Sequence, residues 1–590
     1  MARAVQVNVL DGNLGLSPGS NQNIILLMGC ALGNNAGGGV PNTLYSFGDP
    51  VTAANSLVGG ELLELVGYVL KSAPGATVQA MPLNPTTRGG IGTFTKVGTG
   101  ALTITPSLAP HGAVTISCTT AGTLGTAVFT FGVTNPITGV TTTSAPVTSA
   151  AGWSSTGYAI PGTYVTWVAT AGSYTNTDVY SISTLGGAIT HPAGAGPAVG
   201  TYTASPVDSY YKLQVYITTA GAVGTSQFTY SLDGGSTVSS TVTSAASYAI
   251  PNTGIVLGFS GTAVAGDVYT CSGVAAPTFA NSDFTAAGTA LTSTYINSAF
   301  YSQVGVVGSV ASAAAWATQV AAAETQALSF NAINLYPRYH VGGPTVGTIL
   351  PAAGSITVDS ADTDSVVIAA RAGMSAPHVD AAAGDGLMVS PVTGYVFRRN
   401  AVWGAIGRGA ATIASQDIGA FADGGVASFT SCVRDDFANG LTFFNSGITS
   451  LQTYGAGSPV FLNRGFCATL STSDYYPLTN SRVIDQACAI AVLNAKQYIL
   501  AKLPTQTRNG IVGTIREDKA QQIEARINAA LNSGLGIGNP QTANAVAAAC
   551  QVTRTNNIFS SGQLILTVSV QPFGYAVSVV VNIGLTLQAS

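Results

Sequence analysis

Charged side chains are scarce in this chain. Asp, Glu, Lys and Arg make up 7% of its 590 residues, against about 25% in an ordinary soluble domain. The net charge of −4 is small for this length, so no charge excess steers the chain toward nucleic acid or an anionic membrane. Glycine, alanine, serine and threonine are abundant in place of charged residues. A surface of this kind suits burial in a large assembly.

Long hydrophobic runs are also missing. The longest candidate, residues 24–32, is interrupted by Gly29 and Cys30, and it falls short of the roughly 18 residues that a membrane helix requires. The N-terminus carries one Arg and no apolar stretch directly after it, which argues against a secretory signal peptide. We therefore expect no direct membrane insertion, and we attribute the positive mean hydropathy of +0.37 to small-residue packing.

The sequence lacks the motifs of common catalytic and cofactor sites. It has no P-loop and no HExxH motif, and its four histidines stand far apart, so we predict no catalytic residues, no cofactor and no metal. The seven cysteines include no CxxC pair, which argues against zinc and redox motifs. They are interpreted as buried free thiols or, if the mature particle lives outside a cell, as disulfide partners. These cysteines are Cys30, Cys118, Cys271, Cys432, Cys467, Cys488 and Cys550.

Both ends of the chain alternate between apolar and polar residues, a pattern typical of half-buried β-strands. The apolar positions are Val5, Val7 and Val9 at one end, and Leu564, Leu566, Val568, Val577, Val579, Val581, Ile583 and Leu585 at the other. Because an open apolar edge strand recruits other chains, we predict that these strands link neighbouring subunits by completing their sheets. The alternative is that the two ends pair within one monomer.

An internal repeat lies where charges are sparsest. Residues 119–126 recur as 218–225, and two further motifs recur in the same order: Tyr158-Ala159-Ile160-Pro161 as Tyr248-Ala249-Ile250-Pro251, and Asp178-Val179-Tyr180 as Asp267-Val268-Tyr269. Each copy is rich in Thr, Val and Tyr and is broken by Gly and Pro, which is typical of a small β-sandwich. We predict two inserted, immunoglobulin-like β-sandwich repeats, at 100–198 and 199–280, with a hairpin turn at 232–236.

Helices and strands alternate on both sides of this insert. A helical run with leucines and valines covers 57–70, and an Ala-rich helix at 309–326 leads into a strand at 328–335. This alternation predicts one α/β domain split by the insert, 21–99 and 281–399.

The last third of the chain is predicted as a second core domain, 400–572. A helix is expected at about 482–503, before Pro504. Thr514 and Glu517 match a capping box, and the helix after them presents Ile523, Ile527 and Leu531 on one face and stops at Gly534. The charged runs Arg398-Arg399 and Arg434-Asp435-Asp436 are interpreted as helix-end or surface ion pairs.

The predicted fold class is therefore α+β and multidomain. It combines α/β core domains, two inserted β-sandwich repeats and extended N- and C-terminal β-strand arms, at 1–20 and 573–590.

Several stretches, taken in order, resemble the tail sheath protein family of contractile bacteriophage tails and related contractile injection systems. They are Phe47-Gly48-Asp49-Pro50, then a helix and Ala76 to Pro82; Gly457-Ser458-Pro459-Val460 with Asn463-Arg464-Gly465; Arg482-Val483-Ile484-Asp485; Asn509-Gly510 with Gly513-Thr514-Ile515; and Gly562-Gln563-Leu564 leading to Val570-Gln571-Pro572. The ordered set covers roughly 21–82 and 400–590. The insert lies outside it and resembles the variable outward-facing domains of such sheaths.

This resemblance implies a non-enzymatic subunit that polymerises with itself as stacked six-fold rings around a tail tube. It implies terminal arms that complete sheets in neighbouring subunits, contraction triggered by a baseplate, a tail terminator protein as a further partner, and a place in the virion after assembly in the host cytoplasm. The run Arg516, Glu517, Asp518 and Lys519 matches a helix that faces the tube in the family, and a solvated helix start is the alternative. The very low charge departs from the family and leaves the tube-facing contacts open.

Two rival functions follow from other features. The Thr- and Gly-rich repeats suggest a secreted or surface β-rich adhesin, which would carry an export signal and no linking strands. The sandwiches also suggest an enzyme with carbohydrate-binding modules, which would need a catalytic constellation.

Overall fold

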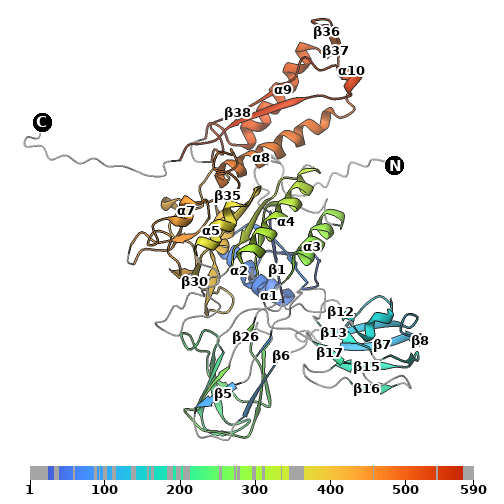
Figure 1. Cartoon of the computed structure of the whole chain (residues 1–590), viewed down its shortest axis with the longest axis vertical. Helices are drawn as coiled ribbons and strands as arrows, with labels where there is room; N and C mark the ends of the chain where they lie inside the picture. The colour runs from blue at the N-terminus through green and yellow to red at the C-terminus, as the bar shows by residue number, and fades with distance from the viewer. Residues whose placement is uncertain are drawn as a thin grey trace, which may run out of the picture. The chain divides into compact units, whose positions relative to one another are not determined.

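The structure is a computed structural model of the chain (Figure 1). It describes residues 24–31, 39–57, 60–84, 90–91, 94–97, 103–108, 114–134, 141–155, 158–160, 165–169, 171–182, 190–193, 201–203, 213–251, 255–271, 274–275, 279–294, 301–308, 312–333, 335–344, 364–455, 457–539 and 542–575. The chain divides into a larger unit, 22–412 with 417–481, and a smaller unit, 1–21 with 413–416 and 482–590. Of the helices in the described ranges, none has the length and apolarity to cross a bilayer.

A seven-stranded sheet lies at the centre of the larger unit. Its strand order is β2 (Tyr45–Phe47), β3 (Thr77–Pro82), β1 (Ile24–Gly29), β27 (Tyr301–Val306), β28 (Arg338–Gly342), β29 (Ala376–Ala382) and β35 (Cys467–Ala468). The inner strands from β3 to β29 run parallel, and both edge strands run antiparallel to their neighbours. The chain thus leaves the sheet after β3 and rejoins it at β27, on the far side of the insert.

Helices cover both faces of this sheet. The helices of the larger unit are α1 (Pro50–Leu57), α2 (Glu61–Ser72), α3 (Asn281–Thr294), α4 (Ala313–Asn331), α5 (Asp364–Ala372), α6 (Ala401–Ala411) and the short α7 (Thr442–Asn445). α2 and α6 share one core with Ile25 and Leu27, whereas α3 and α4 share the other with Leu26 and Met28. Successive strand residues point to opposite faces. The run of apolar residues in β1 is therefore what a sheet covered on both faces requires.

The Ala-rich helix starts and ends later than the predicted helix at 309–326. α4 begins after its N-cap Ser312 and continues to Asn331, so the predicted strand at 328–335 was wrong, and the next strand, β28, starts at Arg338. Residues 328–332 alternate between apolar and polar side chains. Ala323, Ala327 and Phe330 instead recur at helical spacing and are all buried against the sheet, and this packing decides the structure.

The two inserted sandwiches are nested rather than consecutive. The first runs from β7 (Val114–Thr120) to β17 (Thr201–Thr203), which pairs with β13 (Val165–Val168). The second joins β5 (Phe94–Val97) and β6 (Thr103–Leu108), which precede the first, to β25 (Val268–Cys271) and β23 (Ile255–Ser260), which follow it. The predicted boundaries at 100–198 and 199–280 therefore do not match the strand pairing. The repeated motifs mark only the central strands and carry no signal for the strands that close each sandwich.

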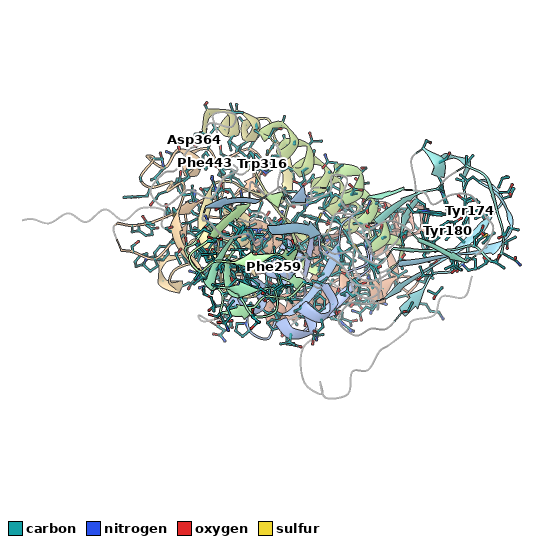
Figure 2. The ribbon with its side chains drawn as sticks, turned by 90° about the horizontal axis from the view of Figure 1, so that it is seen from below. Tyr174, Tyr180, Phe259, Trp316, Asp364 and Phe443 are labelled. Carbon is teal, nitrogen blue, oxygen red and sulfur yellow. The ribbon has the colours of Figure 1, made fainter. Side chains whose placement is uncertain are left out.

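Aromatic side chains fill both sandwiches. In the first, Trp167 lies among Phe129, Tyr174 and Tyr180, with ring centroids 5.2 to 6.4 Å away, and Figure 2 shows Tyr174 and Tyr180 side by side. In the second, the ring centroids of Phe228 and Phe259 lie 4.8 Å apart. The repeated Asp178 and Asp267 are both buried.

Several arginines that were expected in surface or helix-end ion pairs are buried instead. Arg399 pairs with Glu64, and their side chains are 6% and 3% exposed. Arg398 pairs with Asp385 at 2.8 Å, with side chains 9% and 0% exposed. The sequence interpretation was wrong here because Glu64 and Arg399 are 335 positions apart, and such a pair leaves no local signal.

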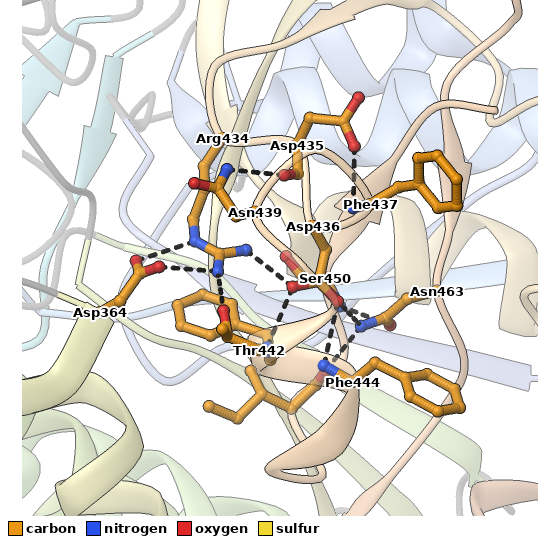
Figure 3. Close-up of polar contacts among 12 residues, drawn as sticks. Asp364, Arg434, Asp435, Asp436, Phe437, Asn439, Thr442, Phe444, Ser450 and Asn463 are labelled. Atoms are coloured by element: carbon orange, nitrogen blue, oxygen red, sulfur yellow. Dashed lines mark hydrogen bonds and ion pairs between the residues drawn. The ribbon is translucent and has the colours of Figure 1, made fainter. Parts of the chain in front are cut away.

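A third arginine belongs to a buried polar cluster centred on Asp436 (Figure 3). The Asp436 carboxylate is fully buried and accepts hydrogen bonds from Arg434 Nη1 and from Asn463 Nδ2, both at 3.0 Å. It also accepts the N–H groups of Phe443 and Phe444, at 3.0 and 2.9 Å. These two amides lie in the first turn of α7 and have no partner within the helix, so Asp436 fixes α7 against the loop that precedes it.

The division between the units falls later than the predicted boundary at 400. Asn400 ends β31 (Val396–Asn400) and caps α6, accepting a hydrogen bond from Val402 N–H at 2.9 Å. β35 pairs with β29 of the large sheet. Most of 400–481 accordingly belongs to the larger unit.

The smaller unit packs helices against two hairpins. Its elements are α8 (Leu478–Ala495, shared with the larger unit at its start), β36 (Thr505–Arg508), β37 (Ile511–Ile515), α9 (Glu517–Gly534), β38 (Ala547–Val552), α10 (Ile558–Ser561) and β39 (Leu566–Gln571). α8 ends earlier than the predicted helix at 482–503 and is followed by a 3-10 turn to Tyr498. The predicted face of α9 is confirmed, because Ile523, Ile527 and Leu531 are fully buried.

The predicted capping box of α9 was wrong. Thr514 lies in β37, where its hydroxyl donates to Gln506 C=O at 2.9 Å. The N-cap position is Arg516, which forms no side-chain cap. Hairpin pairing of β36 with β37 holds Thr514 in a strand, so it stands two residues before the position that the motif requires.

Candidate strand-addition site

β38 and β39 form a two-stranded antiparallel sheet in the smaller unit, with a register from Ala547↔Gln571 to Val552↔Leu566. One face packs on the core that α8 and α9 build. Burial is uneven across this face. Cys550 and Val552 of β38 are 4% and 2% exposed, whereas the core-facing residues of β39 are only half-buried: Leu566, Val568 and Val570. The apolar face is therefore incompletely covered on the β39 side.

The register shows which backbone groups of β39 point away from β38. Thr553 N–H donates to Ile565 C=O at 2.9 Å, so this pair is a hydrogen-bonded one. Hydrogen-bonded and non-hydrogen-bonded pairs alternate in an antiparallel ladder. The N–H and C=O groups of Leu566, Val568 and Val570 accordingly face the outer edge, and no hydrogen bond to these groups comes from the part of the chain that the structure describes.

The core beneath this sheet is built by residues of two helices. Val483, Ala487 and Ile490 of α8 and the buried face of α9 belong to one hydrophobic core with β38 and β39.

The structure places the predicted linking residues in different situations. Leu564, Leu566 and Val568 lie at or in β39, which pairs within its own chain through one edge. Two sets lie outside the described residues: Val5, Val7 and Val9, and Val577, Val579, Val581, Ile583 and Leu585. The chain is held as far as Tyr575, whose hydroxyl donates to Ser415 C=O, so an arm would start after this anchor rather than at 573.

The four predicted tube-facing residues are paired within the chain. Arg516 Nη2 lies 2.7 Å from Asp518 Oδ2, and both side chains are about half exposed. Glu517 pairs with Arg508 and with Arg554, each at 2.9 Å. Lys519 Nζ lies 5.9 Å from the ring centroid of Tyr498. A contact of this helix start with a tube stays a prediction.

Three polar residues of this region gave no signal in the sequence: Glu524 and Asn528 of α9, and Arg554 after β38. Glu524 Oε1 accepts Val552 N–H at 2.7 Å, and Asn528 Oδ1 accepts Cys550 N–H at 2.6 Å. Arg554 donates to both Glu517 and Glu524. Their spacing of four residues puts Glu524 and Asn528 on one side of α9, but only the tertiary structure shows that this side meets β38.

The Arg554 cluster makes the smaller unit sensitive to acid. Hydrogen bonds from Arg554 lower the pKa of Glu517 to about 2, and Arg554 likewise holds the pKa of Glu524 below its ordinary value of 4.5. Because both folded-state pKa values lie below the unfolded ones, the carboxylates stabilise the fold above pH 4.5, and this contribution disappears as the pH falls through 4.5 toward 2. We expect urea unfolding midpoints to fall over this range less steeply in Arg554→Met than in the parent. Equal slopes would contradict a role for the cluster.

Among the cysteines whose side chains the structure describes, none is in a disulfide within the chain: Cys30, Cys118, Cys432, Cys467, Cys488 and Cys550. Cys432 and Cys488 are half-buried, and burial raises the pKa of the Cys432 thiol to about 12. Nothing is described of the side chain of Cys271. Disulfides between subunits stay an open alternative.

Comparison with known proteins gives matches by structure. No family model and no curated protein sequence matches the chain. The chain is similar to the sheath tail protein from Desulfitobacterium hafniense, at 10% identity and a TM-score of 0.40 over 97% of this chain and 100% of that one. It is also similar to a chain of the anti-feeding prophage baseplate, at 10% identity and a TM-score of 0.34 over 53% of this chain and 76% of that one. A third match is a chain of the contracted PVC sheath complex, from an extracellular contractile injection system. Its identity is 10% and its TM-score 0.35, over 51% of this chain and 75% of that one.

Proposed function

We propose that this chain is a structural, non-enzymatic subunit of a contractile tail sheath, and that it polymerises by strand addition at β39. One observation carries the proposal: the described part of the chain leaves the outward N–H and C=O groups of β39 without a hydrogen bond and its apolar face only half covered. An edge of this kind accepts an extended segment of another copy. The two alternating ends of the chain, Val5–Val9 and Val577–Leu585, are the segments of matching pattern.

Side-chain burial decides whether such an addition holds. The three outward-facing residues of β39 allow about six main-chain hydrogen bonds, each worth about 0.5 to 1.5 kcal/mol net. Ordering six residues of a free arm costs about 1 to 2 kcal/mol per residue. The hydrogen bonds therefore do not suffice, and covering Leu566, Val568 and Val570 with apolar arm residues must supply the difference, at about 25 cal/mol per Å². An arm that alternates between apolar and polar residues meets this requirement.

In the proposed assembly, copies form stacked six-fold rings around a tail tube protein, with a baseplate at one end and a terminator protein at the other. The particle is a virion or phage-like tail that assembles in the host cytoplasm. Added strands tether each subunit to its neighbours while the bodies repack as rigid units during contraction. The Arg516–Lys519 helix start is the proposed contact with the tube.

Removing residues 577–590 tests this proposal. We expect a soluble, folded chain that does not polymerise, because β38, β39 and the Tyr575 anchor remain while the donated strand is lost. Circular dichroism and thermal melting check the fold, and negative-stain microscopy with sedimentation checks the assembly. Hollow tubes or ring stacks are expected only from the intact chain.

A matched pair of variants separates strand addition from mere chain length. Replacing Val577, Val579 and Val581 by serine should prevent polymerisation, since these residues would cover the apolar face. Replacing Ser578 and Asn582, on the other face of the same segment, by alanine should leave assembly intact. Normal tubes from the truncated chain or from the serine variant would refute the linking role.

A further inference from the structure

The outer edge of β38 is closed by side chains of α9. Cys550 N–H donates to Asn528 Oδ1 at 2.6 Å, and Val552 N–H donates to Glu524 Oε1 at 2.7 Å. Both amides belong to residues that stand opposite Val568 and Leu566 in non-hydrogen-bonded pairs. Their N–H groups therefore point away from β39, toward the position that an added strand would occupy.

The spacing of residues four apart on a helix matches the spacing of alternate residues on a strand, so one helix can cap two successive outward amides. Residues four apart on a helix are about 6 Å apart along its axis, and alternate residues of a strand are about 6.8 Å apart. Glu524 and Asn528 thus reach Val552 and Cys550 in turn. Each side-chain oxygen takes the place of a carbonyl oxygen of a neighbouring strand, so these positions of the β38 edge are already hydrogen-bonded.

The cap at Val552 is held in place by a second contact. Arg554 Nη2 donates to Glu524 Oε2 at 2.9 Å, and the same guanidinium donates to Glu517 at the start of α9. Glu524 therefore bonds both to the strand edge and to Arg554, two residues after the end of β38. The β39 edge has no corresponding cap from the described residues, so the two edges of this sheet differ in what they offer to an incoming strand.

We propose that Glu524 and Asn528 are specificity-determining residues that close the β38 edge and confine strand addition to β39. The inference rests on the proposed function, since it concerns the same sheet. A strand that pairs with β38 would first have to displace both side chains and break both hydrogen bonds. One closed edge gives each subunit a single direction of growth, whereas two open edges would join chains on both sides and produce irregular aggregates.

The test uses the full chain with the β39 edge blocked. Val568→Pro removes an outward N–H of that edge and is expected to abolish association. Adding Glu524→Ala and Asn528→Ala opens the β38 edge, and association should return, as irregular rather than tubular particles in negative-stain images and sedimentation. Hydrogen exchange of the Cys550 and Val552 amides is measured by NMR at concentrations too low for association. Under these conditions both amides should exchange at least tenfold faster in the triple variant than in the Val568→Pro chain.

Two results would overturn the inference. One is a triple variant whose two amides exchange fast but which remains as unassociated as Val568→Pro alone. The other is unchanged amide exchange, which would mean that the side chains do not protect the edge. Glu524→Gln with Asn528 intact is the control, because it keeps an acceptor oxygen for Val552 N–H. It should retain slow exchange and no association in the Val568→Pro background.

Failure of the proposed function gives a different result. If Val568→Pro alone assembles into normal tubes, strand addition at β39 is refuted, whatever the amides do. The exchange rates of Cys550 and Val552 then still decide whether Glu524 and Asn528 cap the β38 edge. The two ideas are therefore separable in one set of samples.

Discussion

A Val568→Pro chain is expected to fold normally and to lose the ability to polymerise. The N–H of Val568 points away from β38, so proline at this position removes no hydrogen bond of the β38–β39 pair. Proline is tolerated on edge strands whose N–H faces outward, and its ring obstructs the approach of another strand. The loss of assembly should be complete in negative-stain images, with an unchanged circular dichroism spectrum.

Two neighbouring substitutions make this prediction specific. Val568→Ala keeps the N–H and removes only part of the side chain, so it should still assemble, with a higher critical concentration. Ser569→Pro shifts the change by one residue, to a position whose N–H bonds to Ala549 in the register. It should destabilise the hairpin itself, by roughly the cost of a lost ladder bond and its unsatisfied partner, about 1 to 3 kcal/mol.

The pattern across the three variants decides the interpretation. If Val568→Pro and Ser569→Pro both unfold the smaller unit, the loss of assembly reports on folding and not on the edge. If Val568→Pro is folded and assembles as well as the parent, β39 is not the site of strand addition. A folded, monomeric Val568→Pro chain beside an assembling Val568→Ala chain is the result that the structure predicts.

Asp436→Ala should destabilise the larger unit more than any surface change. The substitution leaves the Arg434 guanidinium, whose side chain is 10% exposed, without its buried partner. It also leaves two backbone amides of α7 without an acceptor, and the Asn463 side-chain amide keeps only Ile448 C=O of its two acceptors. Breaking a buried pair by removing one partner costs about 3 to 5 kcal/mol. The measurement is the urea midpoint of the tryptophan fluorescence transition, since Trp316 and Trp403 are buried in this unit.

A matched control lies on the same guanidinium. Arg434 also pairs with Asp364 at 2.8 Å, but the Asp364 side chain is 40% exposed (Figure 3). Solvent screens this pair, so Asp364→Ala should cost only about 0 to 1 kcal/mol. If the two variants lose similar amounts of unfolding free energy, the stabilisation by the Asp436 cluster does not depend on its burial.

The local pattern of the sequence determined several elements by itself. Alternation from Leu564 to Gln571 predicted the strand β39, because a half-buried strand needs one apolar face. The spacing of Ile523, Ile527 and Leu531 predicted the buried face of α9, and the glycines at 234 and 235, with φ of +74° and +96°, form the predicted turn at 232–236. These features depend on residues a few positions apart, so a single sequence contains them in full.

Only the tertiary structure decided the features that depend on distant residues. It closed the second sandwich with β5 and β6, buried Arg399 against Glu64, and extended α4 through a segment that alternates like a strand. It also made the two edges of the β38–β39 sheet different, because the packing of α9 brings Glu524 and Asn528 to the outward N–H groups of β38. Alternation shows that a strand has an apolar face, but it does not show which edge is free. That depends on which groups, far away in the sequence, lie beside the strand's outward N–H and C=O groups.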